Sequence, residues 1–146
     1  MRVPAFLPDT TCMVAAVCGW HEHHERAAAE IERRLSHGET MIVAAPALVE
    51  TYAVLTRLPP PHRVLPGSAY ELVRANFIEG IAIAGLAAEA YGEVLTDAVG
   101  RGVAGGRTYD AVIVACALAG GASSLLTFNE RDFVSVAGKR LEIVVP

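Results

Sequence analysis

The feature that most constrains the fold is the alternation of short apolar runs with longer segments of helical character. Five runs have the length and composition of β-strands, at residues 3–7, 41–44, 78–83, 124–127 and 141–145. Strands that alternate with helices predict a mostly parallel sheet with helices on both of its faces. The 146 residues contain no internal repeat and no long linker. We therefore expect one α/β domain over residues 1–146, with a central five-stranded sheet.

The segments between these runs carry signals for the beginning and end of helices. Pro46 and Pro66 each stand at the first position of an expected helix, and Gly38 follows the end of another. Gly19 is a candidate break within the first long helical segment. The expected helices cover residues 11–17 and 21–36, 46–58, 66–76, 86–100, 108–118 and 129–136.

Composition excludes several classes of protein. The longest apolar runs, 41–49 and 111–119, have nine residues, whereas a membrane-spanning helix needs about twenty. Pro4, Pro8 and Asp9 interrupt any signal-peptide core, so we expect a cytoplasmic protein without a membrane partner. The net charge of −4 argues against a protein that coats nucleic acid non-specifically. A nuclease remains compatible, because metal ions can supply positive charge at the phosphate.

Acidic side chains recur at the positions where such a sheet binds its ligands. Only four of the sixteen acidic residues are aspartates, and three of them lie in or beside apolar stretches. Asp9 directly follows the first strand, Glu50 lies early in the helix after the second, and Asp132 comes shortly after the run 124–127. Ligands of parallel sheets bind outside the carboxyl ends of the strands, so these acids should converge. Asp110 opens a helix of similar orientation and is the fourth candidate.

A group of converging carboxylates has a chemical consequence. Their mutual repulsion raises their proton affinity unless a cation keeps them ionised, and Mg²⁺ or Mn²⁺ suits oxygen ligands. Such a cation can polarise a phosphoryl oxygen and activate water for attack on a phosphodiester. Taken singly, Asp9 and Asp110 could instead cap the helices that follow them. The remaining aspartate, Asp97, shares a helix face with Glu93 and Arg101 and is interpreted as a surface acid.

Four sequence blocks together point to a known family. They are Leu-Pro-Asp-Thr-Thr at 7–11, Pro-Ala-Leu-Val-Glu at 46–50, Tyr-Asp-Ala at 109–111, and Leu-Leu-Thr-Phe-Asn-Glu-Arg-Asp-Phe at 125–133. In order and spacing, over nearly the whole chain, the sequence resembles a PIN domain. It is most similar to the VapC-like ribonuclease toxins of prokaryotic toxin–antitoxin pairs.

The resemblance implies an enzyme that cleaves single-stranded or loop RNA with Mg²⁺, for which Mn²⁺ would substitute. It implies that Asp9, Glu50 and Asp110 hold the metal and that Asp132 is the fourth acid. The residues that would orient the carboxylates or contact substrate are Thr10, Thr127 and Asn129. It further implies a homodimer, a VapB-like antitoxin that inhibits the enzyme in a hetero-oligomer, and interfaces within residues 46–70.

Two arginines flank the candidate ligands. Arg107 and Arg131 are the best candidates for contacts with substrate phosphate, with a surface salt bridge as the alternative for each. Trp20 and the four tyrosines are scattered along the chain and predict no stacking surface. The His-rich run 21–25 is interpreted as a solvated helix start rather than a metal site.

Two other functions stay open from the residues. The first is another metal-dependent phosphoryl-transfer enzyme on a similar frame, such as a DNA nuclease or a phosphatase. A haloacid-dehalogenase-type phosphatase would need an aspartate two residues after Asp9, where Thr11 stands. The second is a non-catalytic PIN-like module that binds nucleic acid or protein.

Overall fold

The computed structural model describes residues 3–146 and contains one five-stranded sheet in the order β3-β2-β1-β4-β5. All four neighbouring pairs of strands are parallel, which confirms the expected α/β fold. The strands are β1 (Ala5–Pro8), β2 (Thr40–Ala44), β3 (Ala82–Ala84), β4 (Ser124–Leu126) and β5 (Glu142–Val144).

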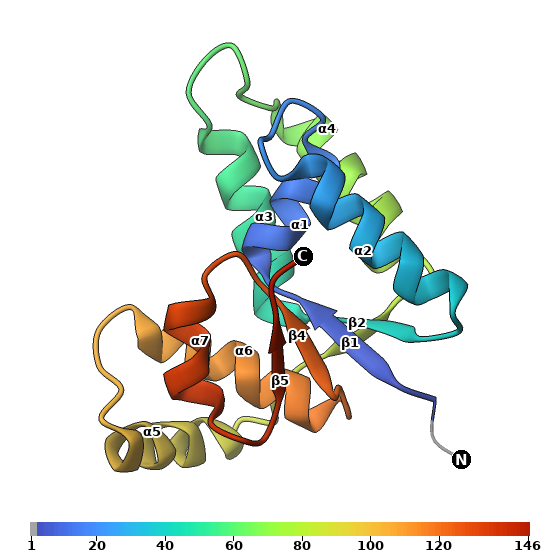
Figure 1. The fold of residues 1–146 in the computed structure, drawn as a ribbon. Coiled ribbons are helices and arrows are strands. Elements are labelled where there is room, and N and C mark those ends of the chain that lie inside the picture. Colours follow the sequence, from blue (N-terminus) through green and yellow to red (C-terminus); the bar gives the residue numbers. More distant parts are fainter. Residues whose placement is uncertain (1–2) are drawn as a thin grey trace.

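Seven α-helices and one π-helical turn connect these strands in the described part of the chain. Figure 1 shows the helices of the first half of the chain grouped in the upper part of the view and α5 to α7 at the lower left, with the sheet between them. The helices are α1 (Thr10–Val17), α2 (His24–Ser36), α3 (Ala45–Arg57), α4 (Pro66–Val73), α5 (Ala90–Arg101), α6 (Arg107–Ala119) and α7 (Glu130–Ala137), and the π-turn is η1 (Arg74–Ile78).

The central strands are buried on both faces, as expected of a parallel sheet covered by helices. Phe6 and Leu7 of β1, and Leu125 and Leu126 of β4, are completely buried. These side chains join one large core cluster that includes the inner face of α6. A smaller cluster lies between α1, α3 and α4. The core therefore fixes β1 and β4, whose ends carry the candidate site.

Two expected boundaries were wrong, and both errors have a local cause. The run 78–83 is not one strand, because Ile78 ends η1 and packs against the smaller cluster. Gly80 then turns the chain with a φ of +72°, a conformation that favours glycine, and only Ala82–Ala84 joins the sheet. The expected break near Gly19 is confirmed, because Cys18 ends α1, but α2 begins at His24 and not at residue 21.

Other sequence expectations concern the surroundings of the protein. Within residues 3–146, no helix has the length and apolar character needed to span a bilayer. Cys12, Cys18 and Cys116 are buried free thiols.

Candidate active site

The neighbouring parallel strands β2, β1 and β4 end at the same edge of the sheet. Their carboxyl ends position most of the candidate residues. β1 ends at Pro8 and is followed by Asp9, and β4 ends at Leu126 and is followed by Thr127. The backbone N–H of Asp9 donates to the carbonyl oxygen of Leu126 at 2.9 Å, which holds these two strand ends together. Glu50 lies on α3, which begins immediately after β2.

Asp9 is 3% exposed, and both of its carboxylate oxygens accept hydrogen bonds. Oδ1 accepts from the hydroxyl of Thr11 at 2.6 Å and from the backbone N–H of Cys12 at 3.0 Å. Oδ2 accepts from the hydroxyl of Thr127 at 2.6 Å. Asp9 is therefore the N-cap of α1, as one sequence interpretation held. A carboxylate has about four lone-pair sites, so one site on Oδ2 stays available for a ligand.

The two threonines connect Asp9 to the loop between β4 and α7. The hydroxyl of Thr11 accepts a hydrogen bond from the backbone N–H of Phe128 at 3.1 Å. The hydroxyl of Thr127 accepts one from the N–H of Asn129 at 2.8 Å. Each hydroxyl thus accepts a hydrogen bond from a backbone N–H group and donates its own hydrogen bond to Asp9. The sequence interpretation missed Thr11, although its position two residues after a strand-end aspartate signals an Asx-type local hydrogen bond.

Burial and hydrogen bonding act in opposite directions on Asp9. Burial raises the pKa of its carboxyl above the usual range, while the bonds from Thr11, Thr127 and Cys12 lower that pKa. The charge of Glu50 adds a smaller upward contribution. Because burial is the largest cause, Asp9 holds its negative charge at a cost that a bound cation would offset.

Asp110 brings the four acids into one electrostatic group. Burial is the largest cause that raises its pKa to about 6, followed by the charges of Asp132, Asp9 and Glu50. The nearby guanidinium of Arg107 opposes this shift. Asp110 is the fourth residue of α6, whose N-cap is Gly106, so the alternative that Asp110 caps this helix is wrong.

The charges of these acids influence one another, but their side chains do not form a closed coordination sphere. In residues 3–146, no three His, Cys, Asp or Glu side chains lie close enough together to ligate one ion. The donor set itself fits Mg²⁺ or Mn²⁺, because it consists of carboxylate oxygens. Burial is the largest cause of the raised pKa of Asp110, and the charges of Asp132, Asp9 and Glu50 add to it more than Arg107 offsets. Asp9, Glu50, Asp110 and Asp132 are thus the residues that could hold such a cation.

The remaining polar candidates occupy different positions around this group. Thr10 is 9% exposed, and its hydroxyl oxygen is buried without a hydrogen-bond partner in the described residues. Asn129 precedes α7 and has an exposed side chain. Arg107 donates to the hydroxyl of Ser135 at 3.0 Å, and Arg131 is exposed. Neither arginine forms an ion pair within residues 3–146, so the alternative of a surface salt bridge is not observed for either.

Asp97 differs from the candidate acids, as expected. It pairs with Arg101 at 3.0 Å and with Arg140 at 3.3 Å on the outer side of α5. These cations give Asp97 a structural role.

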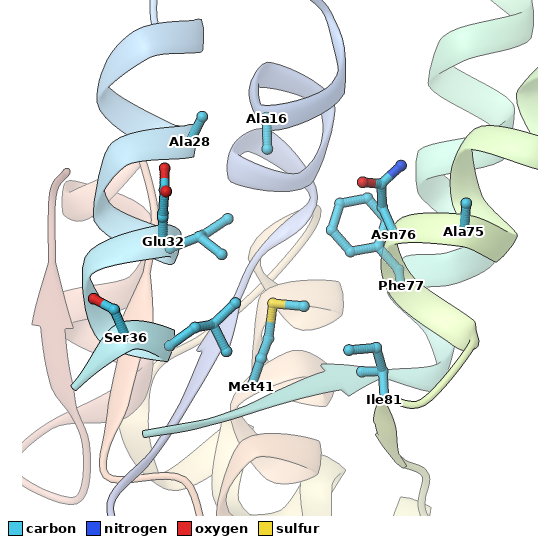
Figure 2. Close-up of a pocket in the computed structure, with 11 residues that line it drawn as sticks. Ala16, Ala28, Glu32, Ser36, Met41, Ala75, Asn76, Phe77 and Ile81 are labelled. Carbon is cyan, nitrogen blue, oxygen red and sulfur yellow. The ribbon is translucent and has the colours of Figure 1, made fainter. Parts of the chain in front are cut away.

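A cavity of about 470 Å³ adjoins the candidate acids, with Thr10, Glu50 and Asn129 in its wall. Its other side carries aromatic rings, an arrangement that the sequence did not predict. A larger cavity of about 600 Å³ lies elsewhere and includes none of the candidate residues. Figure 2 shows its wall of small and apolar side chains from α1, α2, β2 and η1, with Glu32 as its one acidic group. The candidate acids therefore adjoin the first cavity and not the second.

The site thus combines a buried strand-end aspartate with three further acids, and two threonines orient that aspartate. Residues 6–139 match the family model for the PIN domain. The chain belongs to the PIN-domain family.

Within that family the chain belongs to the VapC-like proteins. It is 38% identical over 140 residues to ribonuclease VapC40 of Mycobacterium tuberculosis, covering 93% of this chain and 95% of that one. The fold is similar to that of VapBC2 from Rickettsia felis bound to a promoter DNA fragment, with a TM-score of 0.70, 19% identity and coverage of 97% and 98%. It is also similar to VapC20 of Mycobacterium tuberculosis, a sarcin–ricin loop cleaving toxin, with a TM-score of 0.67, 17% identity and coverage of 91% and 95%.

Proposed function

We propose that this protein is a Mg²⁺- or Mn²⁺-dependent endoribonuclease toxin that cleaves a phosphodiester in single-stranded or loop RNA. The observation that carries the proposal is the coupling of Asp110 to Asp132, Asp9 and Glu50 at the carboxyl edge of the sheet. The 38% identity to a ribonuclease named VapC40 supports RNA as the substrate.

The four acids would hold the cation, and each does so from a different environment. Asp9 is held in place by Thr11 and Thr127, which leaves Oδ2 as its ligand atom. Asp110 is half-buried, and its pKa is raised first by burial and then by repulsion from the other acids, which the cation would offset. When bound, the cation would polarise the phosphoryl oxygen and lower the pKa of a bound water.

The polar residues around the acids have separate roles in this proposal. Thr127 and Thr10 orient the site, and Asn129 contacts substrate from the start of α7. Arg107 lies near Asp110 and has no ion-pair partner in the described residues, so its guanidinium is available to a phosphate. Arg131 is exposed in the first turn of α7 and is the second phosphate contact.

A comparison of substrates tests the proposed activity. The purified protein should cleave an unstructured RNA in Mg²⁺ or Mn²⁺, and excess chelator should stop cleavage. The same sequence as DNA and a small phosphomonoester should remain intact. Hydrolysis of either one in preference to RNA would favour another phosphoryl-transfer enzyme, and the absence of Mn²⁺ binding in titration calorimetry would favour a non-catalytic module.

We also propose that a VapB-like antitoxin binds the toxin near its acidic edge in a hetero-oligomer. The fold neighbour VapBC2 supports this partner, since it is a complex bound to promoter DNA. The excess of carboxylates at Asp9, Glu50, Asp110 and Asp132 would attract a cationic segment of the antitoxin. Addition of the co-encoded antitoxin should suppress RNA cleavage.

The homodimer is a proposal that rests on exposed apolar side chains of α3 and α4. Val49 is 72% exposed, Leu65 is 74% exposed and Tyr70 is 54% exposed. Contiguous exposed apolar side chains commonly mark an interface, and we infer that these three contribute to one. Sedimentation of the protein without antitoxin should give twice the mass of the chain, and Leu65→Lys together with Val49→Lys should give the monomer.

A further inference from the structure

Five aromatic side chains from three separate segments form a continuous row beside the candidate acids. We call it the aromatic row, and it runs in the order His62, Trp20, His21, His23, Phe128. Trp20 stacks on His62 with ring centroids 3.9 Å apart, and His23 stacks on Phe128 at 4.3 Å. His21 links the two stacks through tilted contacts at 5.7 Å and 5.6 Å. The sequence expectation that no stacking surface exists was therefore wrong.

The aromatic row lines the cavity of about 470 Å³ that adjoins the acids. Trp20, His21, His23 and Phe128 belong to its wall, together with Glu50. A cavity of this size lies within the range of small-ligand sites, roughly 300–1,000 Å³. The phosphodiester at the acids and a group in this cavity would thus be adjacent parts of one substrate.

The row remains accessible, unlike a row that only packs a core. Trp20 is 48% exposed although His62 covers one face of its indole ring. Burial is the first cause that lowers the pKa of His21, and the neighbouring charge of His23 is the second. The lowered pKa favours a neutral imidazole, which stacks as an uncharged aromatic ring.

The charged residues in the cavity wall favour a nucleobase over a phosphate. Its wall includes Glu22 and Glu50 and has no lysine or arginine among the described residues. Glu50 would be neutralised by the cation, but Glu22 disfavours a phosphate at the Trp20 end of the cavity. The guanidinium of Arg26 lies 5.5 Å from the centroid of the Phe128 ring. A nucleobase is uncharged and offers two aromatic faces. Unstacked bases of single-stranded RNA bind to aromatic side chains in this way.

The wall also offers a polar group to the edge of a base. The amide of Asn129 is exposed and lines the same cavity. This amide both donates and accepts hydrogen bonds, as the edges of nucleobases require.

We propose that the aromatic row is a base-binding subsite, in which Trp20 and the cavity next to it hold one unpaired nucleobase adjacent to the cleaved phosphodiester. This subsite rests on the ribonuclease function proposed above and adds to it a specific position, beside Trp20, for one base next to the cleaved phosphodiester. It also explains how a chain of net charge −4 retains an anionic substrate, because stacking supplies affinity that does not depend on cationic side chains.

The single tryptophan of the chain provides a direct test. The Asp110→Asn variant in Mg²⁺ buffer is titrated with a mixed-sequence decaribonucleotide and with an abasic oligomer of the same length. The decaribonucleotide should quench Trp20 fluorescence, and the abasic oligomer should not. Equal quenching by both oligomers, or none by either, would overturn the subsite. Quenching by the co-encoded antitoxin but not by RNA would make the cavity a protein-binding surface and would also overturn it.

Kinetics of the otherwise unchanged protein separate a substrate contact from a structural role. Trp20→Ala should raise KM for RNA about tenfold, within the roughly 5- to 150-fold range for loss of one stacked base. The matched control is Tyr91→Ala on α5, since Tyr91 is 44% exposed and does not line the cavity. Trp20→Phe retains a stacking face and should restore KM to within about threefold of the original value.

The outcomes distinguish this subsite from the proposed function. If both Trp20→Ala and Tyr91→Ala cleave RNA with equal KM values, the subsite is overturned, whereas the proposed ribonuclease function is still supported. Base-dependent quenching without any RNA cleavage would overturn the ribonuclease and support the subsite. If the Trp20→Ala protein does not fold, His62→Ala is tested in its place. The same rise in KM is expected, because His62 stacks on Trp20.

Discussion

The hydroxyl of Thr127 donates a 2.6 Å hydrogen bond to Oδ2 of Asp9, although 118 residues separate the two in the sequence. The hydroxyl accepts its own hydrogen bond from the backbone N–H of Asn129, so its proton is directed at the carboxylate. Asp9 is thereby fixed between the ends of β1 and β4. Thr127 acts on the site through Asp9 and is a positioning residue.

Replacement of Thr127 should affect both stability and activity. Thr127→Val keeps the shape of the side chain but leaves Oδ2 of the buried Asp9 without this hydrogen bond. The free energy of unfolding should fall by about 1–3 kcal/mol, and cleavage should fall about 10- to 100-fold. Denaturant unfolding and an RNA cleavage assay measure the two effects. Thr96→Val is the matched control, because the exposed Thr96 only bonds the carbonyl oxygen of Gly92. Equal effects of the two substitutions would contradict the role of Thr127.

The raised pKa of Asp110 predicts a pH-dependent stability. Its pKa is about 6 in the folded chain against 3.8 for an unperturbed aspartate. The folded state therefore binds this proton more tightly, and the stability it contributes is present below pH 3.8 and lost as the pH rises through about 6. Asp110→Asn should be more stable than the unchanged protein above pH 6, by an amount on the order of 1 kcal/mol after allowance for solvent screening.

Thermal unfolding in chelator between pH 4 and pH 8 measures this difference. The difference in stability between Asp110→Asn and the unchanged protein should be small near pH 4 and should grow toward pH 6. A difference that does not change with pH would mean that Asp110 titrates normally. Asp97→Asn should not be more stable than the unchanged protein above pH 6, because the substitution removes the ion pairs with Arg101 and Arg140.

Divalent cations should stabilise the protein through the same acids. A ligand that binds only the folded state adds about 2.7 kcal/mol to the free energy of unfolding at 100 times its dissociation constant. Mg²⁺ or Mn²⁺ should therefore raise the melting temperature of the unchanged protein. The rise should be absent in Asp9→Asn and in Asp110→Asn, and unchanged in Asp97→Asn. An equal rise in all four proteins would place the cation elsewhere.

Loss of a single acid should reduce cleavage to different degrees. Asp9→Asn and Asp110→Asn should lower kcat/KM about 100-fold or more, because each removes a charge from the cation site. Glu50→Gln and Asp132→Asn should lower it less, since Glu50 is exposed and Asp132 is only partly buried. Steady-state cleavage of one labelled RNA measures all four variants. Full activity of Asp9→Asn and Asp110→Asn would show that the proposed site is wrong.

The fold could be predicted from the sequence because its main determinants are local. The buried strands β1 and β4 are short apolar runs, and helix signals such as Pro46 and Pro66 mark the segments between strands. The boundaries failed where tertiary packing competed with local pattern. Ile78 looks like the start of a strand, but it packs against the smaller core cluster instead.

The candidate acids were also accessible to sequence reasoning, for a geometric reason. In a parallel sheet the residues that follow adjacent strands meet at one edge, so Asp9 and Thr127 had to be near one another. The sequence alone could not tell that Asp110 titrates near pH 6, because that shift depends on burial and on the distances to three other acids.

The sequence by itself determined a parallel α/β domain with acids at one edge of its sheet. The reason is that short local patterns of apolar residues predict which strands are buried and where they end. Only the tertiary structure decided how the acids are held and what lies beside them. Thr11 reaches Asp9 from the first turn of α1, and Thr127 reaches it from the loop after β4. The aromatic row joins residues 20–23, 62 and 128, which have no periodic spacing and become neighbours only when the core brings three loops together.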